Sequence, residues 1–380
     1  MLLSAVVLSI FVYGVISSLL GSMLPTLGFS GIQNGTLALT QASGLAVGAF
    51  SAGPFIDSRG KKAALVTGLA ALSFALWLMP AAGGNLTLAT ALWFVLGLGG
   101  GMLGTASNSL ISDIGGERRS SILNFGNLFF GLGLMITPFL ASLIHSGDVR
   151  ALCYFGASLA TMTLVLHASI RMPPPNPDHR FSMAQALDLL RSPALMAFAG
   201  ISFLYVACEV GVSNWLVKYL IAQGIERDHS LRIMSFGFAF GLLSGRIAAT
   251  WILHRFTAAN VVCAGSVLMA LSTLWVLLSG NNTTLVASAV FCAGFAMGPV
   301  FPTNLGMVGD LFPRGTGTAM GLVITSGWLG LAVSSRLIGA IAGADESRLG
   351  QALYLFPVFS VFMIAISLMI RKMFARVKPL

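Results

Sequence analysis

Long apolar segments dominate this chain and leave few folds open to it. Twelve such segments follow one another along the 380 residues, and a helix of about 20 apolar residues can cross a bilayer. Only 9% of the residues are charged, against roughly 25% in an average soluble domain, so a water-exposed surface cannot be covered. We therefore expect an all-α polytopic membrane protein with spans at residues 3–25, 34–56, 63–82, 87–112, 121–144, 151–171, 194–221, 231–253, 259–279, 284–309, 317–343 and 351–371.

Basic residues are distributed unevenly between the two sides of the expected membrane. Of the 21 lysines and arginines, fourteen fall on the side that carries both termini, four on the opposite side and three within spans. Positive charge in short loops marks the cytoplasmic side, so we expect both termini in the cytoplasm at a plasma (bacterial inner) membrane. This topology explains the net charge of +9 without a nucleic-acid partner. The first segment has no basic residues before it, and we interpret it as a span rather than a signal peptide.

The chain resembles itself at an offset of 197 residues. Gly44 and Gly48 align with Gly241 and Gly245, and the same offset aligns spans 1, 2, 4 and 5 with spans 7, 8, 10 and 11. Glycines match easily by chance in a glycine-rich chain, but a constant offset over four pairs of spans does not arise easily. The pattern predicts two six-helix bundles in parallel repeat, an architecture typical of transporters.

A polar, proline-rich segment separates the two predicted bundles. We place the N-terminal bundle at residues 1–171, a cytoplasmic linker at 172–192 and the C-terminal bundle at 193–380. Within the linker, Met183 and Leu187 fall on one helical face with Leu190. The linker therefore contains either a short interfacial helix or a simple loop.

The turn after the second span carries a recognisable motif. Residues 53–62 resemble the major facilitator superfamily signature G-x-x-x-D-(R/K)-x-G-(R/K)-(R/K), although Ser58 departs from it and Arg59 stands one place late. Together with twelve spans and a two-fold repeat, this resemblance covers the whole chain and implies the fold of that superfamily. The matching residues are Gly53, Asp57, Gly60, Lys61 and Lys62.

The resemblance also implies a role for the motif. In the family, the glycine lets the second helix approach the eleventh, and the carboxylate faces the start of that helix. Here Asp57 would face the segment that begins near Thr316, where free N–H groups and the helix dipole stabilise an anion. Such a contact would latch the cytoplasmic side. Lys61 and Lys62 either belong to the latch or only set the topology.

Three further stretches resemble the fucose-permease, or sugar–proton symporter, branch of the superfamily. They are residues 205–215, 245–246 and 298–304. That branch carries carboxylates in its first and fourth helices, whereas here the corresponding spans contain none before Asp113 at the cytoplasmic edge. The usual proton site of the branch is therefore missing, and the antiporter signature G-P-x-x-G-G is also absent from the fifth span.

Glu209 is the one acidic residue in the middle of a span, with Tyr205 and Ser213 on the same helical face. An ionisable residue at membrane depth is costly and suggests function. Glu209 could carry a proton, or it could form a structural ion pair. Arg246 and Arg336 are the candidate partners; either could instead bind an anionic substrate or reach the membrane interface.

Neutral side chains complete the candidate binding site. Gln41 and Asn127 lie deep within spans, and their amides can donate to and accept from a hydroxylated solute. Trp215 and Trp328 could stack on a sugar ring, or they could serve packing and lipid contacts.

These features favour a secondary or facilitative transporter of a small, sugar-like solute by alternating access, with protons coupled through Glu209 as an option. An organic-anion transporter that uses Arg246 or Arg336 is the alternative, and a non-transporting membrane sensor on the same fold is a third. We find no motif for an enzyme, a metal site or a cofactor, and no ATP-binding loop. We expect a monomer whose partners are the solute, protons and lipid.

Overall fold

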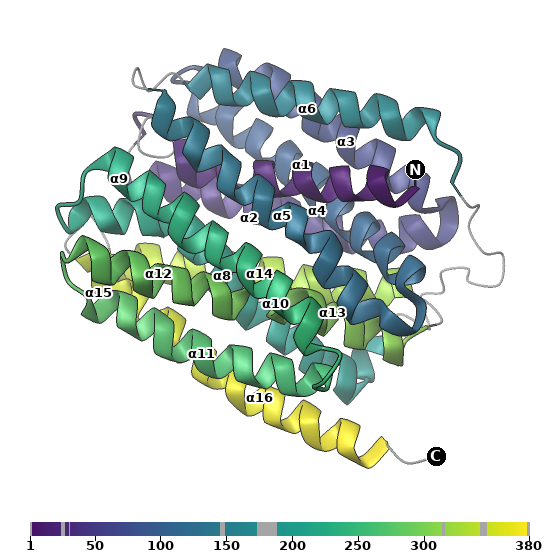
Figure 1. The fold of residues 1–380 in the computed structure, drawn as a ribbon. Helices are drawn as coiled ribbons and strands as arrows, with labels where there is room; N and C mark the ends of the chain where they lie inside the picture. Colours follow the sequence, from purple (N-terminus) through teal and green to yellow (C-terminus); the bar gives the residue numbers. More distant parts are fainter. Residues whose placement is uncertain are drawn as a thin grey trace.

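The computed structural model describes residues 2–23, 27–29, 31–144, 149–172, 188–313, 316–342 and 348–377, and the regular secondary structure in these ranges is helical. The helices run side by side and nearly parallel (Figure 1). They are α1 (Leu2–Met23), α2 (Gly31–Arg59), α3 (Lys61–Leu78) with η2 (Met79–Ala82), α4 (Leu86–Gly115), α5 (Arg119–Leu143), α6 (Val149–Ser169), α8 (Pro193–Ala222), α9 (Arg227–Arg232) with η5 (Ile233–Ala239) and α10 (Phe240–Ile252), α11 (Ala258–Leu278), α12 (Thr283–Met297) with α13 (Val300–Leu311), α14 (Thr316–Ala342), and α15 (Leu349–Leu353) with α16 (Leu355–Val377).

Eleven helical segments of the described chain are long and apolar enough to cross a membrane. α2 is equally long, with 29 residues, but its many glycine, serine and threonine residues lower its hydropathy. This helix packs against α4 on one side and α14 on the other, so helix contacts replace much of its lipid contact. With α2 included, the described helices correspond to the twelve expected spans.

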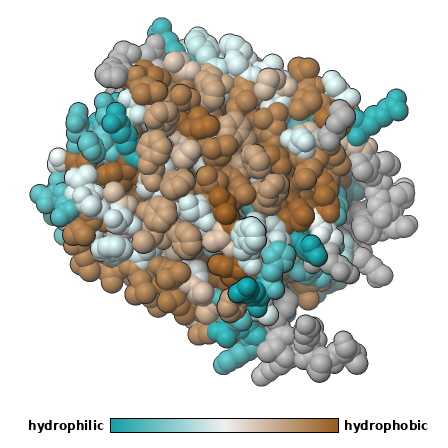
Figure 2. Space-filling view, viewed as in Figure 1, coloured by the Kyte–Doolittle hydropathy of each residue, from teal (hydrophilic) through white to brown (hydrophobic). Residues whose placement is uncertain are grey.

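Apolar side chains cover most of the face seen in Figure 2, and hydrophilic residues gather toward its margins. Large apolar residues such as Phe74, Leu271 and Phe362 are exposed on this scaffold. A soluble protein rarely exposes that much apolar surface to water. In a membrane, the acyl chains of lipids would cover it.

Both termini lie at the same end of the bundle, on the right in Figure 1, whereas α9 and α15 lie at the other end. We call these ends the termini face and the opposite face, and we call α1 to α6 the first half and α8 to α16 the second half. The predicted interfacial helix at Met183 and Leu187 lies outside the described residues, while residues 188–191 form one helical turn in which Leu190 is exposed.

Glycines bring equivalent helices of the two halves into equivalent contacts. A Cβ atom on Gly44 would overlap the carbonyl oxygen of Phe94, and one on Gly241 would overlap that of Phe291. Both residues of the second contact follow those of the first at the offset of 197 found in the sequence. Three more glycine–carbonyl contacts recur in the same way: Gly48–Leu98 with Gly245–Phe295, Gly97–Gln41 with Gly294–Phe238, and Gly101–Leu45 with Gly298–Leu242.

We expect Gly44→Ala and Gly241→Ala to destabilise the protein by about 1–3 kcal/mol each, because the new methyl group must displace a neighbouring backbone. Gly339→Ala is the matched control, since a Cβ atom there would meet nothing within 4 Å. Thermal unfolding in detergent measures the difference. Equal unfolding temperatures for all three variants would contradict close glycine packing.

Candidate functional site

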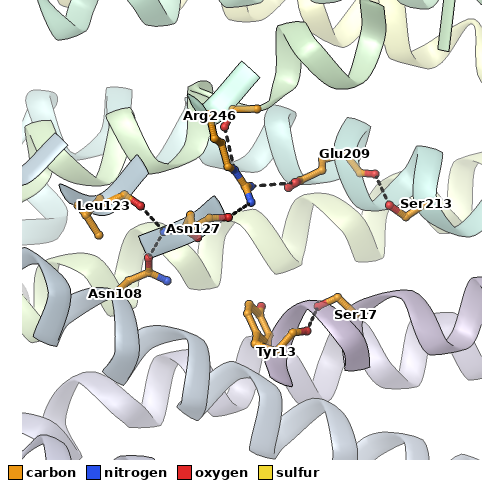
Figure 3. Close-up of polar contacts among 9 residues, drawn as sticks. Tyr13, Ser17, Asn108, Leu123, Asn127, Glu209, Ser213 and Arg246 are labelled. Atoms are coloured by element: carbon orange, nitrogen blue, oxygen red, sulfur yellow. Dashed lines mark hydrogen bonds and ion pairs between the residues drawn. The ribbon is translucent and has the colours of Figure 1, made fainter. Parts of the chain in front are cut away.

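Two buried charged residues face each other inside the second half. Arg246 on α10 is 1% exposed and Glu209 on α8 is 5% exposed. Nη2 of Arg246 donates to Oε1 of Glu209 over 3.4 Å (Figure 3). A charge in a low-dielectric interior is costly unless an opposite charge balances it, so this pairing explains how both residues can lie at membrane depth.

Arg246 is also bound by main-chain oxygens from both halves. Its Nε donates to the carbonyl oxygen of Gly298 over 3.1 Å, and its Nη1 donates to that of Asn127 on α5 over 2.6 Å. The guanidinium carbon lies 5.0 Å from the centre of the Phe130 ring, also on α5, which adds a cation–π attraction. A side chain of the second half is thus tied to the first half.

An aromatic group from α1 continues this contact toward α14. The Tyr13 ring lies 5.4 Å from the Phe130 ring and meets Trp328 edge-on at 6.4 Å. It rests on α4, where Cβ atoms at Gly100 or Gly104 would come within 3.6 or 3.1 Å of it. Neither Tyr13 nor Phe130 was predicted from the sequence. The glycine run of α4 signals a close approach, but it does not say which side chain approaches.

Tyr205 lies one turn before Glu209 and stacks on Phe301 at 5.8 Å. Its hydroxyl is close to Glu209 and Arg246, yet it forms no hydrogen bond of good geometry among the described residues. Ser213, predicted on the same face, donates instead to the main-chain oxygen of Glu209. The Tyr205 hydroxyl is therefore a buried polar group beside the ion pair with hydrogen-bonding capacity to spare.

The two predicted amides have different surroundings. Nδ2 of Asn127 donates to Oδ1 of Asn108 and to the carbonyl oxygen of Leu123, each over 2.9 Å. Gln41 is buried on α2 against Gly97 of α4, and the contacts of the described residues do not connect it to Arg246. The structure thus places Asn127 in contact with Arg246 and leaves Gln41 apart from it.

Trp215 and Trp328 are both buried, and their indole N–H groups have no hydrogen-bond partner in the described ranges. Trp328 contacts the Tyr13 ring, which in turn contacts Phe130 beside Arg246. Arg336 is exposed on α14, so it is Arg246 and not Arg336 that pairs with Glu209. Within the described chain, no group of three or more His, Cys, Asp or Glu side chains could hold a metal ion.

The motif after α2 meets the start of α14. The Thr318 hydroxyl donates to Oδ2 of Asp57, and a Cβ atom on Gly317 would lie 2.7 Å from Oδ1 of the same carboxylate. Gly53 permits the approach, because its own Cβ would come within 3.0 Å of the Thr318 Cα. Gly60 has a φ of 87°, a left-handed conformation that favours glycine, where the chain turns from α2 into α3.

The two lysines of the motif bind within the first half. Nζ of Lys61 lies 2.6 Å from the carboxylate of Asp113 at the end of α4. Nζ of Lys62 donates to the carbonyl oxygens of Ala168 and Ile170 at the end of α6, where a cation is favourable. Asp57, in contrast, reaches across to the second half.

A second polar contact joins the halves at the termini face. Nη1 of Arg119, at the start of α5, donates to the carbonyl oxygen of Gly309 over 3.0 Å and to Oδ1 of Asp310 over 3.3 Å. Deeper in the same interface, Asn124 donates to the Thr303 hydroxyl over 3.0 Å. The termini face is therefore closed by contacts from both α2 and α5.

Residues 2–335 match a model of the Major Facilitator Superfamily. The glucose/mannose transporter of Bacillus subtilis is 29% identical over 189 residues, which are 49% of this chain and 45% of that protein. The gentisate transporter of Corynebacterium glutamicum is 24% identical over 357 residues, which are 87% of this chain and 77% of that protein. This chain thus aligns with less than half of the first of these relatives.

Solved transporters share the whole fold. The fucose:proton symporter of E. coli superposes with a TM-score of 0.76 at 19% identity, covering 96% of this chain and 97% of that one. A proton:xylose symporter gives 0.74 at 14% identity, with 96% and 94% covered. A nucleoside transporter gives 0.73 at 15% identity, with 96% and 98% covered. At these identities the similarity establishes the architecture.

We expect Asp57→Asn to open the termini face without unfolding the protein, because the neutral amide loses its attraction to the α14 N-terminus. An interaction of about 0.5–2 kcal/mol corresponds to a two- to thirty-fold shift between two states. Spin labels at Ile114 and Leu311, which are both exposed, would report the distance between α4 and α13.

Single neutralisation of Lys61 or Lys62 is the comparison, since both bind within the first half. If labels in a folded Asp57→Asn variant give the wild-type distances, the contact with α14 is not a latch.

Proposed function

Because this chain belongs to the major facilitator superfamily, we propose that it moves a small, neutral, hydroxylated solute of the sugar type across the membrane by alternating access. The observation that carries this proposal is the balanced charge of Arg246. Its one positive charge meets the carboxylate of Glu209 where the two halves touch, so the site has little net charge to offer an anion.

The surroundings of the ion pair suit a solute rich in hydroxyl groups. The Tyr205 hydroxyl, although close to Glu209 and Arg246, and the Trp328 indole N–H make no hydrogen bond of good geometry among the described residues. A buried polar group without a partner costs about 1–3 kcal/mol. Solute hydroxyls could supply both missing partners. The aromatic faces of Tyr13 and Phe130 would contact the apolar side of a ring. Relatives and structural neighbours named for glucose, mannose, fucose, xylose and nucleosides support the same class.

A carboxylate is the second candidate substrate, favoured by the similarity to a gentisate transporter over 87% of this chain. A bound carboxylate would have to replace Glu209 as the counter-charge of Arg246. The two candidates therefore differ in one property, which is whether Arg246 stays paired with Glu209 when solute binds.

Glu209 is also our proposed proton site. In the described residues, α1 contains no carboxylate and α4 contains only Asp113, which is exposed and paired with Lys61. Protonation of Glu209 would leave Arg246 bound to main-chain oxygens and to Phe130. The contact between the halves would then lose its counter-charge, and this loss would couple the proton to their movement.

We further propose the arrangement in the membrane. The units are a bundle at residues 1–171, a linker at 172–192 and a bundle at 193–380. Both termini lie on the cytoplasmic side of a bacterial inner membrane, and the monomer is sufficient for transport. Reaction of single external cysteines with an impermeant reagent tests the orientation.

A matched ligand pair tests the substrate class. We expect neutral hexoses to raise the unfolding temperature of the purified protein, by an amount that corresponds to about 2.7 kcal/mol at a hundred times Kd, and the corresponding uronates and gentisate to have no effect. In Glu209→Gln the charge of Arg246 is no longer balanced, so uronate affinity should rise at least ten-fold. Stabilisation of the wild type by carboxylates, with none by neutral sugars, would instead favour the anion transporter.

We expect Glu209→Gln to abolish proton-driven accumulation in proteoliposomes while counterflow exchange continues. The amide keeps a hydrogen-bond acceptor for Arg246 but cannot take up a proton. Glu226→Gln is the matched control, because Glu226 is exposed in the turn before α9. If pH-driven uptake persists in Glu209→Gln, the protein transports without proton coupling at this residue.

A further inference from the structure

The segment η5 interrupts an otherwise α-helical span. Residues Ile233–Ala239 form a π-helix between α9 and α10, at the half of the span that lies toward the opposite face (Figure 1). A π turn closes i→i+5 hydrogen bonds and so holds more residues than an α turn. Such turns are rare and often occur at functional positions, which makes η5 a candidate for conformational change.

η5 touches the first half through two neighbouring residues. The Ser235 hydroxyl donates to the carbonyl oxygen of Met135 on α5 over 2.7 Å. The Phe236 ring meets the Phe139 ring edge-on at 5.5 Å. Ser235 is fully buried, whereas Phe236 and Phe139 are both exposed, so Ser235 lies deeper in the interface than the aromatic pair. These contacts close the interface between α5 and η5 toward the opposite face.

The other side of η5 borders a void within the second half. Phe238 lines a cavity of about 20 Å³ together with Val212, Val290, Ala293 and Phe356. Apolar side chains form nearly all of its wall, so it attracts no polar ligand. It does provide unfilled volume behind the π segment, on the side away from α5.

The first half contains the same segment in α-helical form. Residues 36–42, which correspond to 233–239 at the offset of 197, are regular α-helix within α2. Their packing is equivalent, because Gly97 meets the carbonyl oxygen of Gln41 as Gly294 meets that of Phe238. The two halves therefore hold one repeated segment in two helical forms, on the same pattern of neighbours.

We propose that η5 is a gate at the opposite face, and that it opens by converting from π-helix to α-helix. Each α-helical residue turns the chain by about 100°. When the extra residue of the π turn becomes part of a regular α-helix, α9 and the start of η5 therefore rotate relative to α10. That rotation withdraws Ser235 and Phe236 from α5, and Phe238 moves into the void. Arg246 on α10 keeps its place. The gate rests on the alternating-access part of the proposed function, not on the identity of the solute.

Two variants with opposite effects test the gate. Ser235→Ala removes the hydrogen bond to the Met135 carbonyl oxygen that holds the π form against α5, and should favour the open, α-helical form. Ala293→Val adds two methyl groups to the void and should hold the π form. Spin labels at Leu143 on α5 and His229 on α9, both exposed, report the opening in a background without the four native cysteines.

We expect Ser235→Ala to increase the long-distance population at least three-fold, and Ala293→Val to decrease it at least three-fold, with wild-type unfolding temperature in Ala293→Val. Wild-type distances in Ser235→Ala would overturn the proposal. If Ser235→Ala unfolds at a lower temperature than the wild type, Ala293→Val decides alone, and an unchanged distance distribution in that variant overturns the gate. These distances are measured without solute, so failure of the sugar or proton tests leaves the result readable.

Discussion

A guanidinium group cannot lie inside a membrane protein without partners, and the partners of Arg246 organise the centre of this molecule. One carboxylate balances its charge, two main-chain oxygens satisfy further N–H groups, and an aromatic face covers it. These partners come from α8, α5 and the break between α12 and α13, so the requirement to neutralise one charge brings three spans and both halves to a single point. Any solute or proton that enters here must alter this balance.

Close helix packing makes that arrangement possible. Glycines at equivalent positions of the two halves place backbones in direct contact, and dispersion forces between closely packed helices replace the hydrophobic driving force that lipid does not supply. Other glycines allow close approach between the halves, because a Cβ atom on Gly21 would overlap the carbonyl oxygen of Ser213 and one on Gly321 would lie 3.1 Å from that of Ala49. Polar contacts such as Asp57 with Thr318 and Arg119 with Asp310 add directional bonds between the halves at the termini face.

Features of the fold that depend on composition and spacing could be predicted from the sequence. Hydropathy predicted the spans, the offset of 197 predicted repeated glycine contacts, and the family motif predicted that Asp57 meets α14. The sequence alone could not show whether Arg246 or Arg336 pairs with Glu209, because the pairing depends on how each helix is rotated about its axis. Tyr13, Phe130 and the π form of η5 were not predicted either. Packing between distant spans decides which aromatic rings meet, and residues 233–239 contain no proline that would indicate a break in the helix.

The contact between Arg246 and Asn127 uses the main-chain oxygen of Asn127 and not its side chain. Every amino acid carries that oxygen, so a substitution at position 127 leaves the acceptor in place. The side chain, which now binds Asn108, is free to vary without loss of the tether between the halves. The size and polarity of the side chain at position 127 can therefore change during evolution, or by design, while the contact that joins the two halves is inherited unchanged.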